Sequence, residues 1–168
     1  VFDASYDAYR GVIVTVRLFE GRVAAGDSIV FMNSGEKFEV QEVGVFSPGM
    51  KVMPELLAGE TGYIVANIRA VESAGVGDTI THLNRRADAP MPGYRPAKSM
   101  VFCSLYPTDG EAYNLLRDGL GKLKLSDAAL TFTAEASPAL GFGFRCGFLG
   151  LLHMEIVQER LEREYDLT

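Results

Sequence analysis

The chain has 168 residues, of which 48% are hydrophobic, and it carries a formal net charge of −6. The apolar content excludes an intrinsically disordered chain, and the acidic balance argues against a free-standing nucleic-acid-binding protein, which normally carries a basic face. No apolar run approaches the roughly 18 residues that a membrane span needs. The two cysteines, Cys103 and Cys146, fit no C-x-x-C spacing, so we interpret both as buried thiols in a reducing compartment.

Short strands separated by glycine-bearing turns are predicted for the first half of the chain. Apolar residues alternate over residues 12–19, as in a strand with one buried face. Further strands are predicted over 28–32, 38–45, 61–68 and 76–80. The apolar phase of 38–45 slips by one residue at Gln41 and Glu42, which predicts a bulge or a sharp bend. About six short strands and no amphipathic helix predict a closed antiparallel barrel.

A proline-rich segment follows the predicted barrel and holds Pro90, Pro92 and Pro96. Proline cannot donate to a sheet and stiffens an extended chain, so we predict a linker over 89–98. The linker would join a barrel over 1–88 to a second domain over 99–168.

The second domain is predicted to alternate strands and helices. A strand over 100–106 precedes a helix that a capping box of Thr108 and Glu111 would begin. A strand pair over 130–136 and 142–148 then leads into a strongly amphipathic helix over 151–165. One more strand would complete a ferredoxin-like split βαβ sandwich, so we expect a domain that is truncated at its C-terminus and lacks its last strand.

No catalytic motif is found. A phosphate-binding loop, a dinucleotide fingerprint, a nucleophile elbow, a zinc-peptidase motif and a kinase motif are all absent from the sequence. His82, His153 and the two cysteines make a zinc site hard to assemble. We therefore predict no catalytic, cofactor or metal site in this chain.

Basic residues are the candidate contacts to phosphate. Arg85 and Arg86 are the only paired basic residues of the predicted barrel, and Arg69 lies upstream of them. Lys122 and Lys124 end the first predicted helix, where a cation also stabilises the helix dipole, so both interpretations stay open for these lysines.

Arg145 lies in a glycine-flanked strand, where its guanidinium could bind an anion, as in an acylphosphatase-like enzyme. That enzyme would also need a phosphate-cradling loop before the first helix, and none is visible. His153 opens the last helix, and Glu155 two residues later does not face it, so we interpret His153 as ordering the helix start.

Several of these strings resemble translational GTPases. The string GRVAAGD over 21–27 is similar to a G-x-L-x-x-G-D turn of their barrel domain, and AGETG over 58–62 and VGDT over 76–79 match two later turns. In the second domain, GLLHMEI over 150–156 resembles a helix start in the third domain of elongation factor G. The motif residues with an expected structural role are Gly26, Asp27, Gly59, Gly62, Gly77, Asp78, Gly150, His153 and Glu155.

The LepA branch of these GTPases is the one that the second domain resembles. ALGFGFRCGFLG over 139–150 and VQERLEREYD over 157–166 look like LepA, whereas elongation factor G has a different strand there and Glu at the position of Leu151. The resemblance implies a six-stranded translation-factor β-barrel followed by the truncated ferredoxin-like domain. It also implies that the GTPase domain, which binds GTP and Mg, and the C-terminal domains of the parent protein are absent from this fragment.

The same resemblance carries expectations about biology. LepA-type factors are cytoplasmic bacterial GTPases, partly associated with the inner membrane as peripheral proteins, and they have been linked to back-translocation of transfer RNA, fidelity and subunit maturation. The implied partners are small-subunit ribosomal RNA, a small-subunit protein, and the parent's own GTPase and C-terminal domains. We expect a monomer.

Three hypotheses of function follow. The first is a binding module that docks a GTPase on the ribosome and relays conformational change between its domains. The second is a structural spacer with no ribosome contact, which a charge reversal at Arg85 and Arg86 would leave unaffected. The third is the anion-binding, acylphosphatase-like enzyme.

Overall fold

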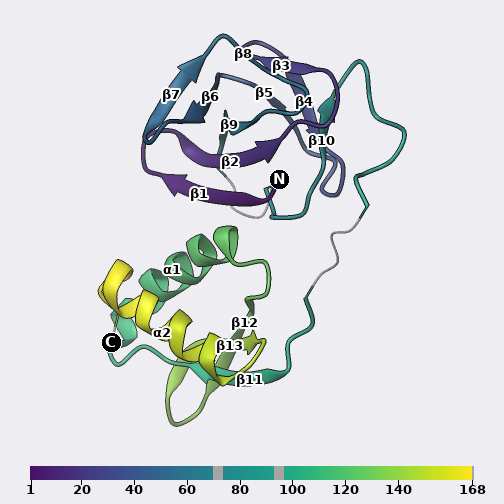
Figure 1. Cartoon of the computed structure of the whole chain (residues 1–168). Helices are drawn as coiled ribbons and strands as arrows, with labels where there is room; N and C mark the ends of the chain where they lie inside the picture. Colours follow the sequence, from purple (N-terminus) through teal and green to yellow (C-terminus); the bar gives the residue numbers. More distant parts are fainter. Residues whose placement is uncertain (70–73, 93–96, 168) are drawn as a thin grey trace. The chain divides into compact units, whose positions relative to one another are not determined.

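The computed structural model of the chain describes residues 1–69, 74–92 and 97–167. The chain divides into two compact units, Val1–Arg95 and Pro96–Thr168 (Figure 1). Residues 93–96, including Pro96 of the predicted linker, lie outside the described residues, so the linker 89–98 and the boundaries on either side stay predictions. None of the helices in the described ranges is long and apolar enough to span a membrane.

The first unit consists of short strands whose pairings are all antiparallel. They form a five-stranded sheet of order β1-β2-β9-β6-β7, a three-stranded sheet of order β10-β4-β5 and the pair β3-β8. Figure 1 shows these sheets curving around one interior. The strands are β1 (Asp3–Asp7), β2 (Gly11–Arg17), β3 (Arg22–Ala24), β4 (Ser28–Phe31), β5 (Lys37–Glu39), β6 (Glu42–Phe46), β7 (Met50–Met53), β8 (Glu55–Leu57), β9 (Thr61–Ile68) and β10 (Ile80–His82).

The predicted number of six strands is too low, because the described part of this unit holds ten. The segment 38–45 bends where its apolar phase slips, so β5 pairs with β4 while β6 pairs with β7 and β9. Strand β1 gives no apolar signal because it reads DASYD, with a single buried residue, Ala4. Bends and polar edge strands therefore divide the barrel more finely than the apolar pattern indicates.

The alternation along β2 places Val12, Val14 and Val16 in the core, as predicted. Ile13 points to the other face and is also buried, in a small cluster with Tyr63 and Val65. The pairing of β2 with β9 shifts register between Val12 and Ile13. A bulge therefore lies at the point where side chains on both faces of β2 are buried.

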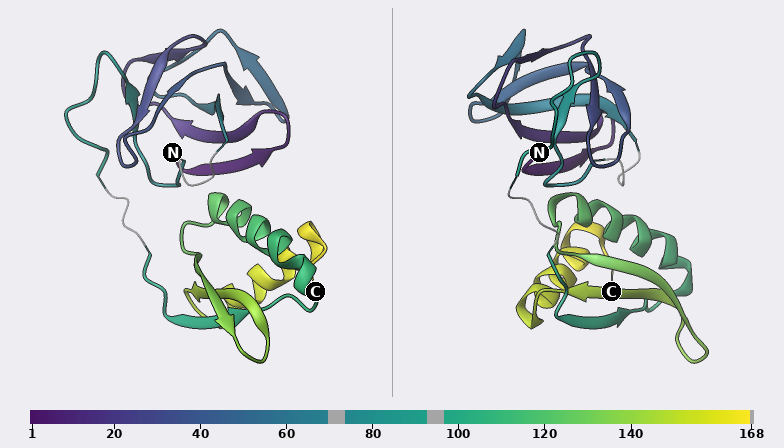
Figure 2. Two further views of the ribbon diagram at one scale, coloured as in Figure 1. Left: turned by 180° about the vertical axis from the view of Figure 1, so that it is seen from behind. Right: turned by 90° about the vertical axis from the view of Figure 1, so that its right-hand side faces the viewer.

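The second unit packs two helices on one face of a three-stranded antiparallel sheet of order β11-β13-β12 (Figures 1 and 2). Its elements are β11 (Val101–Leu105), the 3₁₀ turn η2 (Gly110–Ala112), α1 (Tyr113–Ser126), β12 (Thr131–Ser137), β13 (Gly141–Phe148) and α2 (Leu151–Tyr165). The shared core contains Leu116, Leu120 and Leu123 of α1, Val157 and Leu161 of α2, and Phe144, Cys146 and Phe148 of β13. The strong helical periodicity of 151–165 predicts α2 with its observed bounds.

The start of α1 differs from the predicted capping box. Asp109, not Thr108, is the N-cap residue of the 3₁₀ turn η2 that precedes α1, and its Oδ1 accepts the backbone N–H of Glu111 at 3.0 Å. A short aspartate side chain reaches the N–H two residues on, which favours the tight η2 turn before α1. Gly119 of α1 is buried where the helices meet, since a Cβ there would lie 3.2 Å from the side chain of Leu161.

Candidate functional site

The first unit contains a groove of about 1130 Å³. One side is formed by the end of β2 and the turn after it, and the other side by the segment that follows β10. Its lining includes four arginines, Arg17, Arg22, Arg85 and Arg86. The groove thus brings the predicted pair Arg85–Arg86 together with two arginines that come from the opposite end of the unit's sequence. A cationic groove of this kind is suited to an anionic partner.

Two of these arginines already have partners. Arg22 forms an ion pair with Glu55 at 2.8 Å, and this hydrogen bond raises the pKa of the Arg22 guanidinium above its ordinary value. The guanidinium of Arg17 lies over the ring of Phe19, 5.1 Å from its centroid. Both side chains are therefore held in place on the wall of the groove.

Arg85 and Arg86 are exposed, and they are more available to a ligand than Arg17 and Arg22 are. The Nε of Arg86 donates to the carbonyl oxygen of Leu83 at 3.3 Å, whereas Arg85 has no hydrogen bond or ion pair within the described part of the chain. A guanidinium without a carboxylate partner can meet a phosphate without first breaking an ion pair.

The segment that carries these two arginines is tied by side-chain hydroxyls to β10 and to the residue before it. Thr81 Oγ1 accepts the backbone N–H of Ala87 at 2.8 Å, and Thr79 Oγ1 accepts that of Met91 at 2.9 Å. The backbone N–H of Leu83 also donates to the carbonyl of Ser28 at 2.9 Å. The loop is thus anchored on both sides of Arg85 and Arg86, which positions them at the groove.

Arg69 is not among the residues that line the groove. It is exposed after β9, and its Nε lies 3.5 Å from Oδ1 of Asn67, a residue with a positive φ of 50°. The structure therefore does not join Arg69 to the Arg85–Arg86 pair, and a phosphate contact there stays a separate prediction.

The motif turns of the first unit share one geometry. Gly26, Gly59 and Gly77 have φ values of 89°, 89° and 95°, at the third position of turns closed by hydrogen bonds from the next residue. This is the type II turn, which favours glycine there. The carboxylate of Asp27 accepts the N–H of Ala24 at 2.9 Å, and in the next turn Glu60 accepts that of Leu57 at 2.7 Å.

Asp78 and Gly62 have structural roles other than turn geometry. Asp78 is 8% exposed, and its Oδ1 accepts the backbone N–H groups of Asn33 and Thr79 at 2.9 and 2.7 Å. A Cβ at Gly62 would lie 2.3 Å from the carbonyl oxygen of Gly44, so strands β6 and β9 approach too closely there for any side chain.

In the second unit the candidate cations lie against aromatic rings. Lys122 Nζ is 5.8 Å from the ring centroid of Tyr165, and Lys124 Nζ is 5.6 Å from that of Phe132. The guanidinium of Arg145 lies 5.6 Å from the ring centroid of Phe102 on the neighbouring strand β11. These cation–π contacts give each cation a role within the unit, beside any contact to phosphate.

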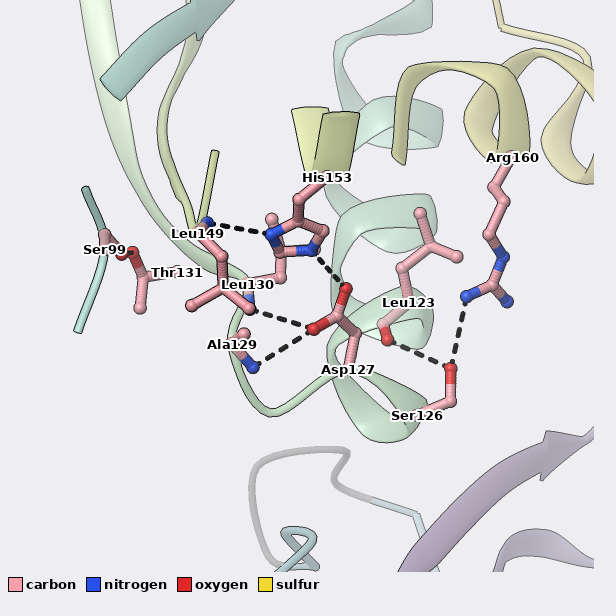
Figure 3. A network of polar contacts seen from close by, with 10 residues as sticks. All are labelled: Ser99, Leu123, Ser126, Asp127, Ala129, Leu130, Thr131, Leu149, His153 and Arg160. Atoms are coloured by element: carbon pink, nitrogen blue, oxygen red, sulfur yellow. Dashed lines mark hydrogen bonds and ion pairs between the residues drawn. The ribbon is translucent and has the colours of Figure 1, made fainter. Parts of the chain in front are cut away.

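His153 joins the start of α2 to the end of α1 (Figure 3). Its Nδ1 accepts the backbone N–H of Leu149 at 3.0 Å, so the ring proton lies on Nε2, which donates to Asp127 Oδ2 at 2.6 Å. The other oxygen of Asp127 accepts the N–H groups of Ala129 and Leu130 at 3.1 and 3.3 Å. The histidine thus orders the start of α2, and a general-base role is not needed to explain it.

The two remaining motif residues of α2 are less constrained. Gly150 has an extended backbone with φ of −178°, and a Cβ there would meet nothing within 4 Å, so nothing in the described structure explains the glycine. Glu155 is exposed.

The two thiols differ, although both are predicted to be buried. Cys146 is fully buried, and burial raises the pKa of its thiol to about 12. Cys103, its partner across the β11–β13 pairing, is only half-buried, because β11 is an edge strand of the sheet. Over the described ranges, no group of three or more His, Cys, Asp or Glu side chains could hold a metal ion.

Sequence reasoning misses three residues that these sites use. Asp127 gives no local signal, because its partner His153 is brought to it only by the packing of α1 against α2. The alternation of Arg17 and Phe19 indicates a strand, and only the fold places them in the groove with Arg85 and Arg86.

Comparison with known families and proteins gives consistent results. The family "Elongation factor Tu domain 2" matches residues 11–81, which supports a β-barrel-like fold of antiparallel sheets for the first unit. A crystal structure of a protein from Thermus thermophilus aligns with 98% of this chain and 24% of its own, with a TM-score of 0.70 and 21% identity. At that identity the likeness concerns the fold.

Curated relatives are much more similar in sequence. "Elongation factor 4" of Gloeothece citriformis is 60% identical over 99% of this chain, and that of Clostridioides difficile is 58% identical over 99%. "Translation factor GUF1 homolog, chloroplastic" of Arabidopsis thaliana is 59% identical over the whole chain. The chain spans 28% of the length of both bacterial relatives and 25% of the Arabidopsis protein.

Proposed function

We propose that this chain, which belongs to the LepA-type elongation factor 4 family, is a ribosome-docking and domain-relay section of a translational GTPase. The observation that carries the proposal is the anchored Arg85–Arg86 pair at the mouth of a cationic groove. Arg85 is exposed and has no ion pair within the described residues, so it is available to phosphates of small-subunit ribosomal RNA.

The catalytic step belongs, in this proposal, to a GTPase domain of the parent protein. That domain would bind GTP and Mg, and the present chain would contribute position and not chemistry. A protein of the small ribosomal subunit and the parent's own GTPase and C-terminal domains would be its further partners, with the whole factor acting as a monomer in the cytoplasm or at the inner membrane surface. We propose that the whole factor acts in back-translocation of transfer RNA, in translational fidelity or in maturation of a ribosomal subunit.

For the second unit we propose a ferredoxin-like sandwich with one strand still to be added. The order β11-β13-β12 with both helices on one face supports this, since a fourth strand would pair with the outer edge of β11. A hollow of about 330 Å³ lies beside that strand, lined by Ser104, Tyr106, Leu116, Leu161 and Leu167 among others. We keep the proposed boundaries at 1–88, 89–98 and 99–168.

Co-sedimentation of the chain with small ribosomal subunits, across a salt series from about 50 to 200 mM, tests the docking function. Binding through phosphates releases counterions, so affinity should fall steeply as salt rises. The variant Arg85→Glu with Arg86→Glu should lose most of this binding. The matched control Lys37→Glu with Lys51→Glu changes the net charge equally, at exposed positions of β5 and β7 outside the groove, and should bind as the wild type.

Two results would contradict docking through this surface. If the chain fails to co-sediment even at low salt, it acts as a spacer and the ribosome contacts lie elsewhere in the parent protein. If both double variants weaken binding equally, the arginine pair has no special role and only the bulk charge of the barrel matters.

A further inference from the structure

We propose that the groove of the first unit binds an unpaired RNA nucleotide, with the base stacked on the Arg17–Phe19 wall and the phosphate held by Arg85 and Arg86. This deepens the proposed docking function and rests on it, because it states which feature of the RNA the docking surface recognises.

Two exposed aromatic rings line the groove. Phe19 is 55% exposed and Phe2 is 43% exposed, and both line the groove. The guanidinium of Arg17 lies over the ring of Phe19, 5.1 Å from its centroid, and this contact helps to hold the exposed ring in place. Unpaired bases stack on aromatic rings and on guanidinium planes of this kind, largely independently of base identity.

The lining of the groove carries more basic than acidic side chains. Besides the four arginines, the groove is lined by only two carboxylates among the described residues, Glu20 and Asp78. The Asp78 carboxylate is nearly buried and already accepts two backbone N–H groups, so it presents little acceptor surface to a ligand. The groove therefore favours an anionic ligand. A nucleotide would use both the ring of Phe19 and the guanidinium of Arg85, whereas an acidic peptide would use only the guanidinium.

The shape of the groove distinguishes an unpaired nucleotide from a duplex. At about 1130 Å³ the hollow slightly exceeds the roughly 300–1,000 Å³ that small-ligand pockets span, which leaves room for a nucleotide. A duplex keeps its bases stacked inside and offers only its phosphates to such a surface. An RNA loop, bulge or end can insert a base against Phe19 while its phosphate reaches Arg85.

Fluorescence anisotropy with the whole chain tests this site. The probes are a short labelled oligouridylate and an RNA duplex of the same length. The variant Phe19→Leu keeps an apolar side chain but removes the stacking ring, and we expect it to lose about tenfold in affinity for the single strand while duplex binding stays unchanged. Phe46→Leu is the matched control, because Phe46 is 49% exposed in the same unit but does not line the groove.

The folding of Phe19→Leu is checked by its thermal unfolding, and Phe2→Leu provides a second variant, at another exposed ring that lines the groove, with the same expected direction. The proposal is overturned if Phe19→Leu and Phe2→Leu bind the single strand as the wild type does. It is also overturned if single strand and duplex bind equally well, or if polyglutamate displaces the single strand as effectively as unlabelled oligouridylate does.

The experiments distinguish failure of the nucleotide site from failure of the docking function. Ribosome binding that Arg85→Glu with Arg86→Glu abolishes but Phe19→Leu leaves intact would support docking through phosphates and overturn the stacking site. Single-strand binding that needs Phe19, in a chain that does not co-sediment with ribosomes, would support the nucleotide site and overturn the docking function.

Discussion

The imidazole of His153 donates from Nε2 to Oδ2 of Asp127 across 2.6 Å, although 26 residues separate them in the chain. Asp127 is the C-cap residue that follows α1, and His153 lies in the first turn of α2, so one hydrogen bond joins the ends of the two helices. The backbone N–H of Leu149 holds the opposite nitrogen, which fixes both the ring orientation and the tautomer (Figure 3).

Replacing this histidine should destabilise the second unit. His153→Ala removes a hydrogen bond to a carboxylate and leaves the N–H of Leu149 without its acceptor, so we expect a loss of about 1.5–3 kcal/mol in the free energy of unfolding. Urea denaturation followed by circular dichroism measures it. Glu155→Ala, an exposed position on the same helix, is the control and should change stability by less than about 0.5 kcal/mol.

A double-mutant cycle with Asp127→Ala shows whether the two side chains act together. Asp127→Ala also deprives Ala129 and Leu130 of an acceptor and should cost more than His153→Ala. If the two losses simply add, the pair is not coupled and our account of His153 is wrong.

How much of the fold the sequence predicts depends on how local the signal is. The strand predicted over 61–68 and the helix predicted over 151–165 have the bounds of β9 and α2, because their periodicity is written in consecutive residues. The segment 38–45 is predicted as one strand, but its two halves pair in different sheets, β5 with β4 and β6 with β9. Which strands pair over long distances in the chain is not indicated by any periodic pattern in the sequence.

The candidate site shows the same limit. Arg85 and Arg86 stand out as adjacent basic residues, so they can be found without a structure. Their neighbours in the groove, Arg17 and Phe19, continue the alternation of a strand and carry no other mark. The pairing of His153 with Asp127 likewise exists only after α1 and α2 have packed together.

Two motif glycines should respond differently to alanine. Gly26 has φ of 89° at the third position of a type II turn, where a Cβ is strained, so Gly26→Ala should lower the free energy of unfolding of the first unit by about 1–2 kcal/mol. Gly150 has an extended backbone and open space around it, so Gly150→Ala should lie within about 0.5 kcal/mol of the wild type. Equal effects in chemical denaturation would show that turn geometry does not explain the motif.

The buried thiol of Cys146 predicts a dependence of stability on alkaline pH. Burial raises its pKa in the folded state to about 12 from an ordinary 9.0, so between these values the unfolded chain releases a proton that the folded chain keeps. Stability relative to Cys146→Ala should therefore be constant below about pH 9 and fall by about 1.4 kcal/mol per pH unit above it.

Comparison with Cys146→Ala removes the contribution of Tyr63, Tyr106 and Tyr165, whose pKa values are also raised. Denaturant titrations of both proteins at several pH values between about 7 and about 11 measure the difference. A stability difference that does not change with pH would mean that the thiol of Cys146 is not shielded from water.

Under the proposed docking function, charge reversals in the two units should weaken ribosome binding unequally. Arg85→Glu with Arg86→Glu removes an available guanidinium and one held only by a neighbouring carbonyl, whereas Lys122 and Lys124 lie against the rings of Tyr165 and Phe132. Both double variants change the net charge equally, so bulk electrostatics predicts equal losses.

We expect the arginine variant to lose at least about tenfold more affinity in co-sedimentation. The slope of log affinity against log salt should also fall by about 0.7 for each single-strand phosphate that the two arginines no longer neutralise. If the lysine variant loses as much and its slope falls equally, α1 binds ribosomal RNA in its own right, and the docking surface extends over both units.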